Sequence, residues 1–349
     1  MARSIARRLG LGVALLSSLA WAAPARLALI ATRGNASESA LYFVEPDASE
    51  LPAAVATFAH LPDATVRGAL LPGTRVLLAV ADRAPVRDHS FDASLLRVEA
   101  GRSNVTLCDR VDHASTPLVT SDGRVFVGRG RPGPSLPGEL RVDELSIDEI
   151  DPASGAARVV FRARGHHASL AGAHGRELLV YFVGPGGASL LAVDRDGGAV
   201  RTIASLLPFA RDFSLAGDAL VFAERDEERH DLWVIDRLDL PSGLRTRLHR
   251  SNNQHLAPHV WPNGEVAFDG GGAAGLQLLG GNLHAPLGEG TDVLRAIAAD
   301  GTRAAVWHYA PNAQWPDVGL LDASGRRAGK IVAPPSTRLE IVGFTSAAP

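Results

Sequence analysis

The chain has very little of several residue types. It contains one cysteine, one methionine and one lysine, and aromatic residues make up 5% of its 349 residues. A single cysteine cannot form an internal disulfide, so the sequence excludes a small domain that disulfides hold together. Cys108 lies in an apolar, strand-like run (residues 105–108), which favours a buried structural thiol over a reactive one.

Long apolar runs are absent beyond the first 22 residues. Residues 9–21 are apolar but short, since a membrane-spanning helix needs roughly 20 apolar residues. Three arginines precede this run (Arg3, Arg7 and Arg8). Residues 20–22, Ala-Trp-Ala, have the small-x-small pattern of a cleavage site. We therefore expect residues 1–22 to be a Sec-type signal peptide without a lipoprotein cysteine. An uncleaved anchor helix and twin-arginine export are the alternatives.

An excess of positive charge is absent as well. The formal net charge is −3, and removal of the three signal-peptide arginines leaves −6. Nucleic-acid binding needs a basic face, and adsorption to anionic lipid needs basic segments. We therefore expect neither nucleic acid nor a membrane surface as the partner. A periplasmic or extracellular monomer that binds a protein or a cell-envelope glycan is the expectation.

Tight turns recur every 36–52 residues along the remaining chain. They lie at Pro72-Gly73, Asp122-Gly123, His174-Gly175, Gly217-Asp218, Asn263-Gly264 and Asp300-Gly301. Such pairs accept the positive φ of a two-residue hairpin. The segments between them, such as residues 75–80 and 178–182, are apolar over five to seven residues, which predicts strands. Four short strands per roughly 45 residues is the unit of a β-propeller blade.

The turn count predicts an all-β fold with a single domain over residues 23–349. We expect a seven-bladed β-propeller, with six blades as the alternative. Blades two to seven are expected to start near Asp63, His113, His166, Pro208, Gln254 and Asp292. Residues 26–30 have the character of a second strand, and residues 339–344 that of a first strand. The C-terminal strand is therefore expected to complete the first blade and close the ring, which removes exposed sheet edges.

One repeat is nearly complete. Residues 258–268, Pro-His-Val-Trp-Pro-Asn-Gly-Glu-Val-Ala-Phe, resemble the WD40-like repeat of TolB-type propellers, and residues 232–248 resemble its second half. Residues 298–302 are a weaker copy, and the other blades are degenerate. The resemblance implies the fold and no activity. TolB has an additional N-terminal domain, whereas strand-like sequence begins here directly after the expected signal peptide, so a TolB role is not implied.

Binding residues are expected in the long loops between the second and third strands of four blades, on one face of the propeller. Arginine and aromatic side chains are common anchors of interfaces. The candidates in these loops are Arg87, His89, Arg129, Arg131, His230, Tyr309 and Trp315. Ordinary solvated loops are the alternative interpretation.

Histidines near the blade starts, His113, His166 and His255, would lie at the channel mouth on the same face. Neutral imidazoles bind divalent metals, and a seven-bladed lyase family of similar architecture has a His/Gln-bound metal. Polar side chains that line a water-filled channel are the alternative, and we expect no cofactor. Since no catalytic motif is recognisable, the sequence favours an exported, non-catalytic binding or scaffold protein. A metal-dependent carbohydrate-active lyase or hydrolase is the second hypothesis.

Overall fold

The computed structural model describes residues 25–62, 64–83, 91–134, 138–261, 264–271, 276–279 and 289–345. Every regular element in these ranges is a β-strand, which confirms the predicted all-β class. These ranges contain no helix with the length and apolar character needed to cross a membrane. The expected signal peptide, residues 1–22, lies outside the described residues.

The first sheet joins the two ends of the described chain. Its order is β27 (Thr337–Phe344), β1 (Leu27–Arg33), β2 (Glu38–Val44) and β3 (Ala56–Ala59). The C-terminal strand β27 pairs antiparallel with β1, in a register that runs from Leu27 opposite Phe344 to Arg33 opposite Thr337. Residues from the end of the sequence therefore supply the strand that the first repeat lacks.

The second sheet has eight strands, which form two successive groups of four. The first group is β4 (Val66–Leu70), β5 (Leu77–Asp82), β6 (Ala93–Val98) and β7 (Val105–Val111). The second is β8 (Leu118–Val119), β9 (Val125–Arg131), β10 (Asp143–Ile150) and β11 (Ala157–Gly165). A single register pair, Val111 opposite Arg129, connects β7 to β9. The short strand β8 pairs with β9 outside the main path of the sheet.

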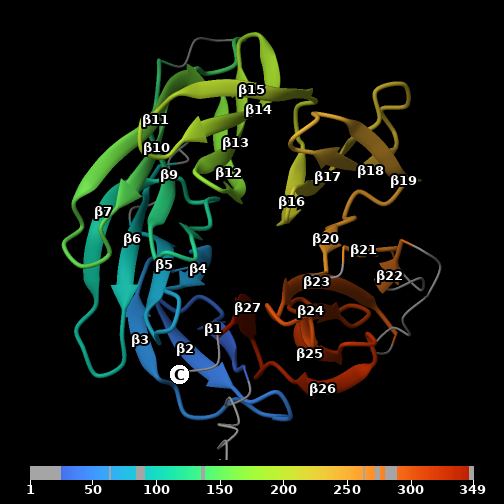
Figure 1. The fold of residues 1–349 in the computed structure, drawn as a ribbon. Helices are drawn as coiled ribbons and strands as arrows, with labels where there is room; N and C mark the ends of the chain where they lie inside the picture. Colours follow the sequence, from blue (N-terminus) through green and yellow to red (C-terminus); the bar gives the residue numbers. More distant parts are fainter. Residues whose placement is uncertain are drawn as a thin grey trace, which may run out of the picture.

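The remaining sheets follow the same order along the chain. One contains β12 (His167–His174), β13 (Glu177–Gly184), β14 (Gly187–Asp194) and β15 (Val200–Leu206). The next contains β16 (Arg211–Ala216), β17 (Ala219–Arg225), β18 (Trp233–Asp239) and β19 (Arg245–Ser251). A smaller sheet holds β20 (His259–Val260), β21 (Val266–Asp269) and β22 (Leu276–Leu278). The last holds β23 (Thr291–Ile297), β24 (Arg303–Tyr309), β25 (Asp317–Asp322) and β26 (Arg327–Ile331). Figure 1 shows these groups arranged in chain order around a centre, with red β27 close to blue β1.

The predicted turns form where the sequence places glycine. Gly123 has a φ of 81° and Gly264 a φ of 87°, a region where a side chain would strain the backbone. The Gly123 amide donates a hydrogen bond to the Thr120 carbonyl oxygen at 2.8 Å, which closes the turn before β9. Short connections of this kind return each strand beside its predecessor.

The hydrophobic core is divided among the spaces between successive strand groups. Leu179 and Tyr181 of one sheet pack with Leu220 and Phe222 of the next. The other clusters in the described residues likewise combine side chains from neighbouring groups, and one of them joins the first group with the last. Burial of apolar area at roughly 25 cal/mol per Å² stabilises these contacts. The inner strands of a group, such as β5 and β17, are therefore buried on both faces, whereas outer strands such as β15 and β19 are largely exposed.

Candidate functional site

The end of β9 carries two arginines on one face. Val125 and Val127 are fully buried against the β4–β7 group, and Arg129 and Arg131 continue the same face because alternate side chains of a strand point the same way. Gly130 points to the other face, where a Cβ would lie 2.6 Å from the Phe91 ring. This face of β9 therefore changes from apolar to positively charged along the strand.

A solvent-open pocket of about 600 Å³ lies over this end of β9. Its lining comes from β7, β9, β10 and β11 and consists of Arg110, Arg129, Gly130, Arg131, Glu144, Ser146, Asp148, Val159 and Arg162. We call these nine residues the arginine pocket. Strand register places Ser146 opposite Arg129 and Glu144 opposite Arg131. Four arginines face two carboxylates, so the lining has an excess of positive charge.

Arg129 is held by a buried ion pair. Its Nη1 lies 2.6 Å from Oδ2 of Asp148, and its Nε donates to the Asp109 carbonyl oxygen at 2.9 Å. The Asp148 residue is only 2% exposed, and a buried charge without its partner would be strongly destabilising. The sequence predicted Arg129 and Arg131 as loop residues, but both belong to β9 because the strand continues through Arg131.

Arg110 and Arg131 are exposed, and the guanidinium group of neither makes a hydrogen bond or an ion pair within the described residues. In contrast, Arg162 lies 3.8 Å from a Glu144 carboxylate oxygen. The Oδ1 atom of Asp148 is buried and has no hydrogen-bond partner in the described part of the chain. The arginine pocket thus offers two unpaired guanidinium groups and one unpaired acceptor. Guanidinium groups are suited to bidentate binding of oxyanions.

The other predicted binding residues do not line this pocket. Arg87 and His89 lie outside the described residues. His230 is exposed in the turn between β17 and β18. Tyr309 ends β24 and packs edge-on to Trp307, and its burial raises the pKa of the phenol. Trp315 lies under the Arg338 guanidinium, 5.8 Å from ring centroid to Cζ.

The three predicted metal-binding histidines are not brought into one cluster. The His166 ring donates from Nδ1 to the Arg141 carbonyl oxygen at 2.8 Å. His255 is exposed, and its Nε2 lies 3.1 Å from the Gln254 amide nitrogen. His113 lies close enough to Asp82 to affect its pKa. Over the described ranges, no three histidine, cysteine or acidic side chains gather in a metal-binding arrangement.

Sequence reasoning missed a set of buried carboxylates at the ends of second strands. Asp82 accepts a hydrogen bond from the Thr65 amide at 3.3 Å, and Glu224 accepts one from the Leu207 amide at 3.1 Å. Each carboxylate thereby holds the chain that approaches the neighbouring first strand. The signal that could have found them is an acidic residue directly after an apolar strand, as in residues 77–82 and 219–224.

Asp269 ends its strand, β21, in the same way, but its Oδ2 is buried without a hydrogen-bond partner in the described residues. Burial, opposed by the Gly271 amide and reinforced by Asp292, raises the pKa of Asp269 to about 6. Asp292 is itself buried and lies 2.7 Å from Nδ1 of His308. The charged form of Asp269 is therefore poorly stabilised in the folded protein.

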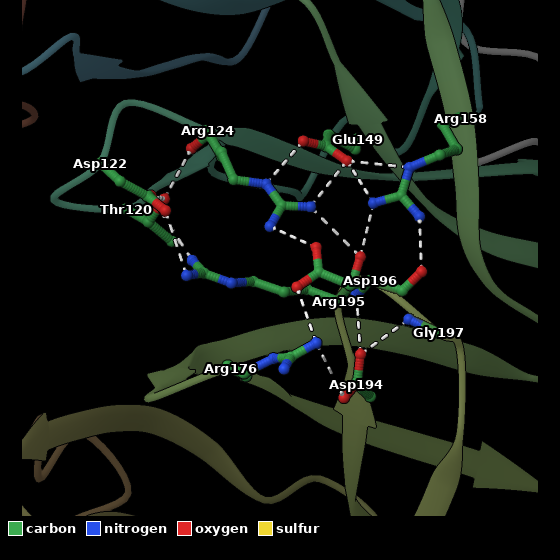
Figure 2. A network of polar contacts seen from close by, with 10 residues as sticks. All are labelled: Thr120, Asp122, Arg124, Glu149, Arg158, Arg176, Asp194, Arg195, Asp196 and Gly197. Atoms are coloured by element: carbon green, nitrogen blue, oxygen red, sulfur yellow. Dashed lines mark hydrogen bonds and ion pairs between the residues drawn. The ribbon is translucent and has the colours of Figure 1, made fainter.

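A second polar network lies at the opposite end of β9 (Figure 2). Arg124 donates to both Glu149 carboxylate oxygens, at 2.7 and 2.9 Å, and to Asp196 at 2.8 Å. Arg124 lowers the pKa of Glu149, with a further contribution from Arg158. Asp196 follows β14, so the network connects the β8–β11 group with the β12–β15 sheet. We interpret it as a structural contact between sheets.

Comparisons with known proteins define the class. No protein-family model matches the sequence, and no curated protein matches it. An oligogalacturonate lyase in complex with manganese has a TM-score of 0.55 at 12% identity, over 88% of this chain and 91% of that chain. The β-propeller domain of the Trilobed protease from Pyrococcus furiosus has a TM-score of 0.50 at 12% identity, over 74% and 81%. The fold is therefore a β-propeller.

TolB from Acinetobacter baumannii is also similar, with a TM-score of 0.49 and 11% identity. The match covers 92% of this chain but only 65% of the TolB chain. The structures with TM-scores of 0.50 and above show a β-propeller, which is the fold that the TolB-type resemblance of residues 258–268 implies. At such low identity the likeness concerns the fold alone.

Proposed function

We propose that this chain is an exported, non-catalytic β-propeller that binds a component of the cell envelope through the arginine pocket. The observation that carries the proposal is the combination of unpaired Arg110 and Arg131 with the unpaired Oδ1 of buried Asp148 in one pocket. The signal-peptide pattern of residues 1–22 supports a periplasmic or extracellular location. The protein acts as a monomer in this proposal.

Binding rather than catalysis is favoured by the chemistry of the pocket. Its basic groups are guanidiniums, which stay protonated and anchor charged ligands instead of transferring protons. Its two carboxylates face arginines, Glu144 beside Arg162 and Asp148 beside Arg129. Both carboxylates are therefore held in ion pairs, which suits a fixed recognition surface.

The proposal includes a ring of seven blades. The β4–β7 and β8–β11 groups count as separate blades because one register pair links them. One hydrophobic cluster packs Leu27 and Leu29 of the first group with Val318 and Leu320 of the last. Together with the pairing of β27 and β1, this cluster supports closure of the ring. A protein that ends at residue 334 is expected to lose cooperative unfolding, whereas an open arrangement predicts little change.

Site-specific photo-crosslinking in living cells tests the proposed function. A photoreactive residue replaces Arg162, at the pocket, or Arg327, an exposed β26 arginine without an ion pair among the described residues. We expect a crosslinked envelope component from position 162 and none from position 327. The Arg110→Gln/Arg131→Gln background should abolish the product. Equal crosslinking from both positions would contradict the proposal.

A further inference from the structure

We infer that the ligand of the arginine pocket is an acidic polysaccharide, a conclusion that rests on the proposed binding function. An oxyanion on one sugar unit, a carboxylate or a sulfate, would accept hydrogen bonds from Arg110 and Arg131. A neighbouring hydroxyl would donate to Oδ1 of Asp148, which lies just beneath the pocket surface and becomes reachable when the side chains around it shift on binding. Three features of the pocket support this assignment: its donors, its orphaned acceptor and the character of its walls.

The unpaired donors converge from two strands. The antiparallel pair Val111 opposite Arg129 brings the end of β7 beside the end of β9, where Arg110 and Arg131 lie. Both arginines line the arginine pocket and also an adjoining pocket of about 580 Å³. Neither is neutralised by a described carboxylate. An oxyanion placed between them would receive charge-assisted hydrogen bonds from both.

The unpaired acceptor, Oδ1 of Asp148, requires a ligand with a hydrogen-bond donor in addition to its anionic group. Oδ2 of Asp148 accepts a hydrogen bond from Arg129, and Oδ1 remains buried without a donor in the described residues. An anionic group cannot satisfy Oδ1, because it has no proton to donate. A hydroxyl can, and Ser146 in the same lining adds a further hydroxyl partner. The ligand therefore has to carry an oxyanion and hydroxyl donors a short distance apart, as acidic sugars do.

The walls favour a sugar chain over a protein. Protein hot spots are dominated by aromatic and aliphatic anchors in desolvated pockets. Among the nine lining residues Val159 alone has an aliphatic side chain, and the others are charged, polar or glycine. The adjoining pocket adds Phe91, Asp92 and Pro132. Phe91 and Pro132 supply a small apolar wall for the C–H face of a sugar ring, and the Asp92 carboxylate can accept a hydrogen bond from a sugar hydroxyl. Two pockets that share Arg110, Gly130 and Arg131 suit an extended chain.

Calorimetric titration of the exported protein, residues 23–349, with defined polymers tests the inference. The probes are an oligouronate, a sulfated dextran, neutral dextran, polyacrylate and polyglutamate. We expect binding of the oligouronate or the sulfated dextran, whichever oxyanion the pocket prefers, and at least tenfold weaker binding of the other three. Arg110→Gln/Arg131→Gln should weaken binding at least tenfold, while Arg327→Gln leaves it unchanged.

Equal affinity for polyacrylate, which has no hydroxyls, or for polyglutamate would overturn the inference, since simple charge attraction would then suffice. The chain length of each bound polymer is measured afterwards, and shortened products would contradict the non-catalytic proposal. If position 162 crosslinks to a protein while no acidic glycan binds, the inference fails and the proposed function stands. If neither the crosslink nor the binding of acidic glycan depends on Arg110 and Arg131, both the inference and the proposed function fail.

Discussion

The contact between the β8–β11 group and the β12–β15 sheet should depend on Arg124. Its guanidinium makes a two-point contact with Glu149 and a third hydrogen bond to Asp196. The Arg124 and Glu149 side chains are 22% and 21% exposed, so water screens them only partly. Hydrogen bonds to charged groups contribute about 1.5–3 kcal/mol each when buried.

Two effects make the loss of stability in Arg124→Met smaller than the sum of these hydrogen-bond contributions. Partial exposure weakens each bond, and Glu149 keeps a second arginine partner, Arg158. We therefore expect Arg124→Met to lower the free energy of unfolding by about 2–3 kcal/mol. With a urea dependence of about 3 kcal/mol/M, the midpoint falls by about 0.7–1 M. Tryptophan fluorescence in a urea titration measures this shift.

The matched control is Arg229→Met. Arg229 also contacts a carboxylate, Asp231 at 2.9 Å, but the pair is local and exposed at 60% and 67%. Exposed pairs contribute little to stability, so its midpoint should stay within experimental error of the wild-type value. If both variants shift the urea midpoint equally, the network in Figure 2 does not stabilise the contact between the sheets.

Three further predictions concern buried ionisable groups. Because the pKa of Asp269 is raised to about 6 from 3.8, the wild-type protein should lose stability as pH rises from about 4 through 6, by roughly 3 kcal/mol at most. Asp269→Asn should therefore unfold at a higher temperature than wild type at pH 8 but not at about pH 3, below both pKa values; a gain of equal size at both pH values would refute the assignment. Partial burial raises the pKa of Cys108 to about 11, so a thiol reagent should react much more slowly with folded than with urea-unfolded protein at pH 8, and equal rates would contradict this effect of burial. Arg245 contacts the buried carboxylates of Glu224 and Asp236, so Arg245→Met should destabilise the fold by about 3–5 kcal/mol in urea. A loss below 1 kcal/mol would mean that these carboxylates have adequate other partners.

Much of the fold was predictable because its signals are local. Glycine-containing turns such as Asp122-Gly123 and apolar runs such as residues 178–182 depend on neighbours in sequence. The pairing of β27 with β1 was also predictable, since residues 26–30 and 339–344 are complementary in character. The sheet of β20–β22 has three strands within the described residues, although its repeat contains the clearest family motif, at residues 258–268.

The candidate site was only partly predictable because it depends on pairing between groups. Arg129 and Arg131 were identified from composition, but their partners were not. Arg110 comes from the preceding group through the single register pair with β9, and Asp148 comes from the next strand through its register with β9. Neither arrangement leaves a short-range pattern in the sequence. The alternation of glycine and arginine in residues 128–131 was the available signal that both arginines share one face.

Co-sedimentation with purified cell envelopes, repeated at increasing salt, tests the central claim most directly. The protein of residues 23–349 is compared with Arg110→Gln/Arg131→Gln and with Arg327→Gln. If the arginine pocket holds the ligand, the wild-type protein and Arg327→Gln sediment at low salt and are released as salt rises. The double variant then stays in the supernatant at every salt concentration. Sedimentation of the double variant to the same extent as wild type would contradict the account.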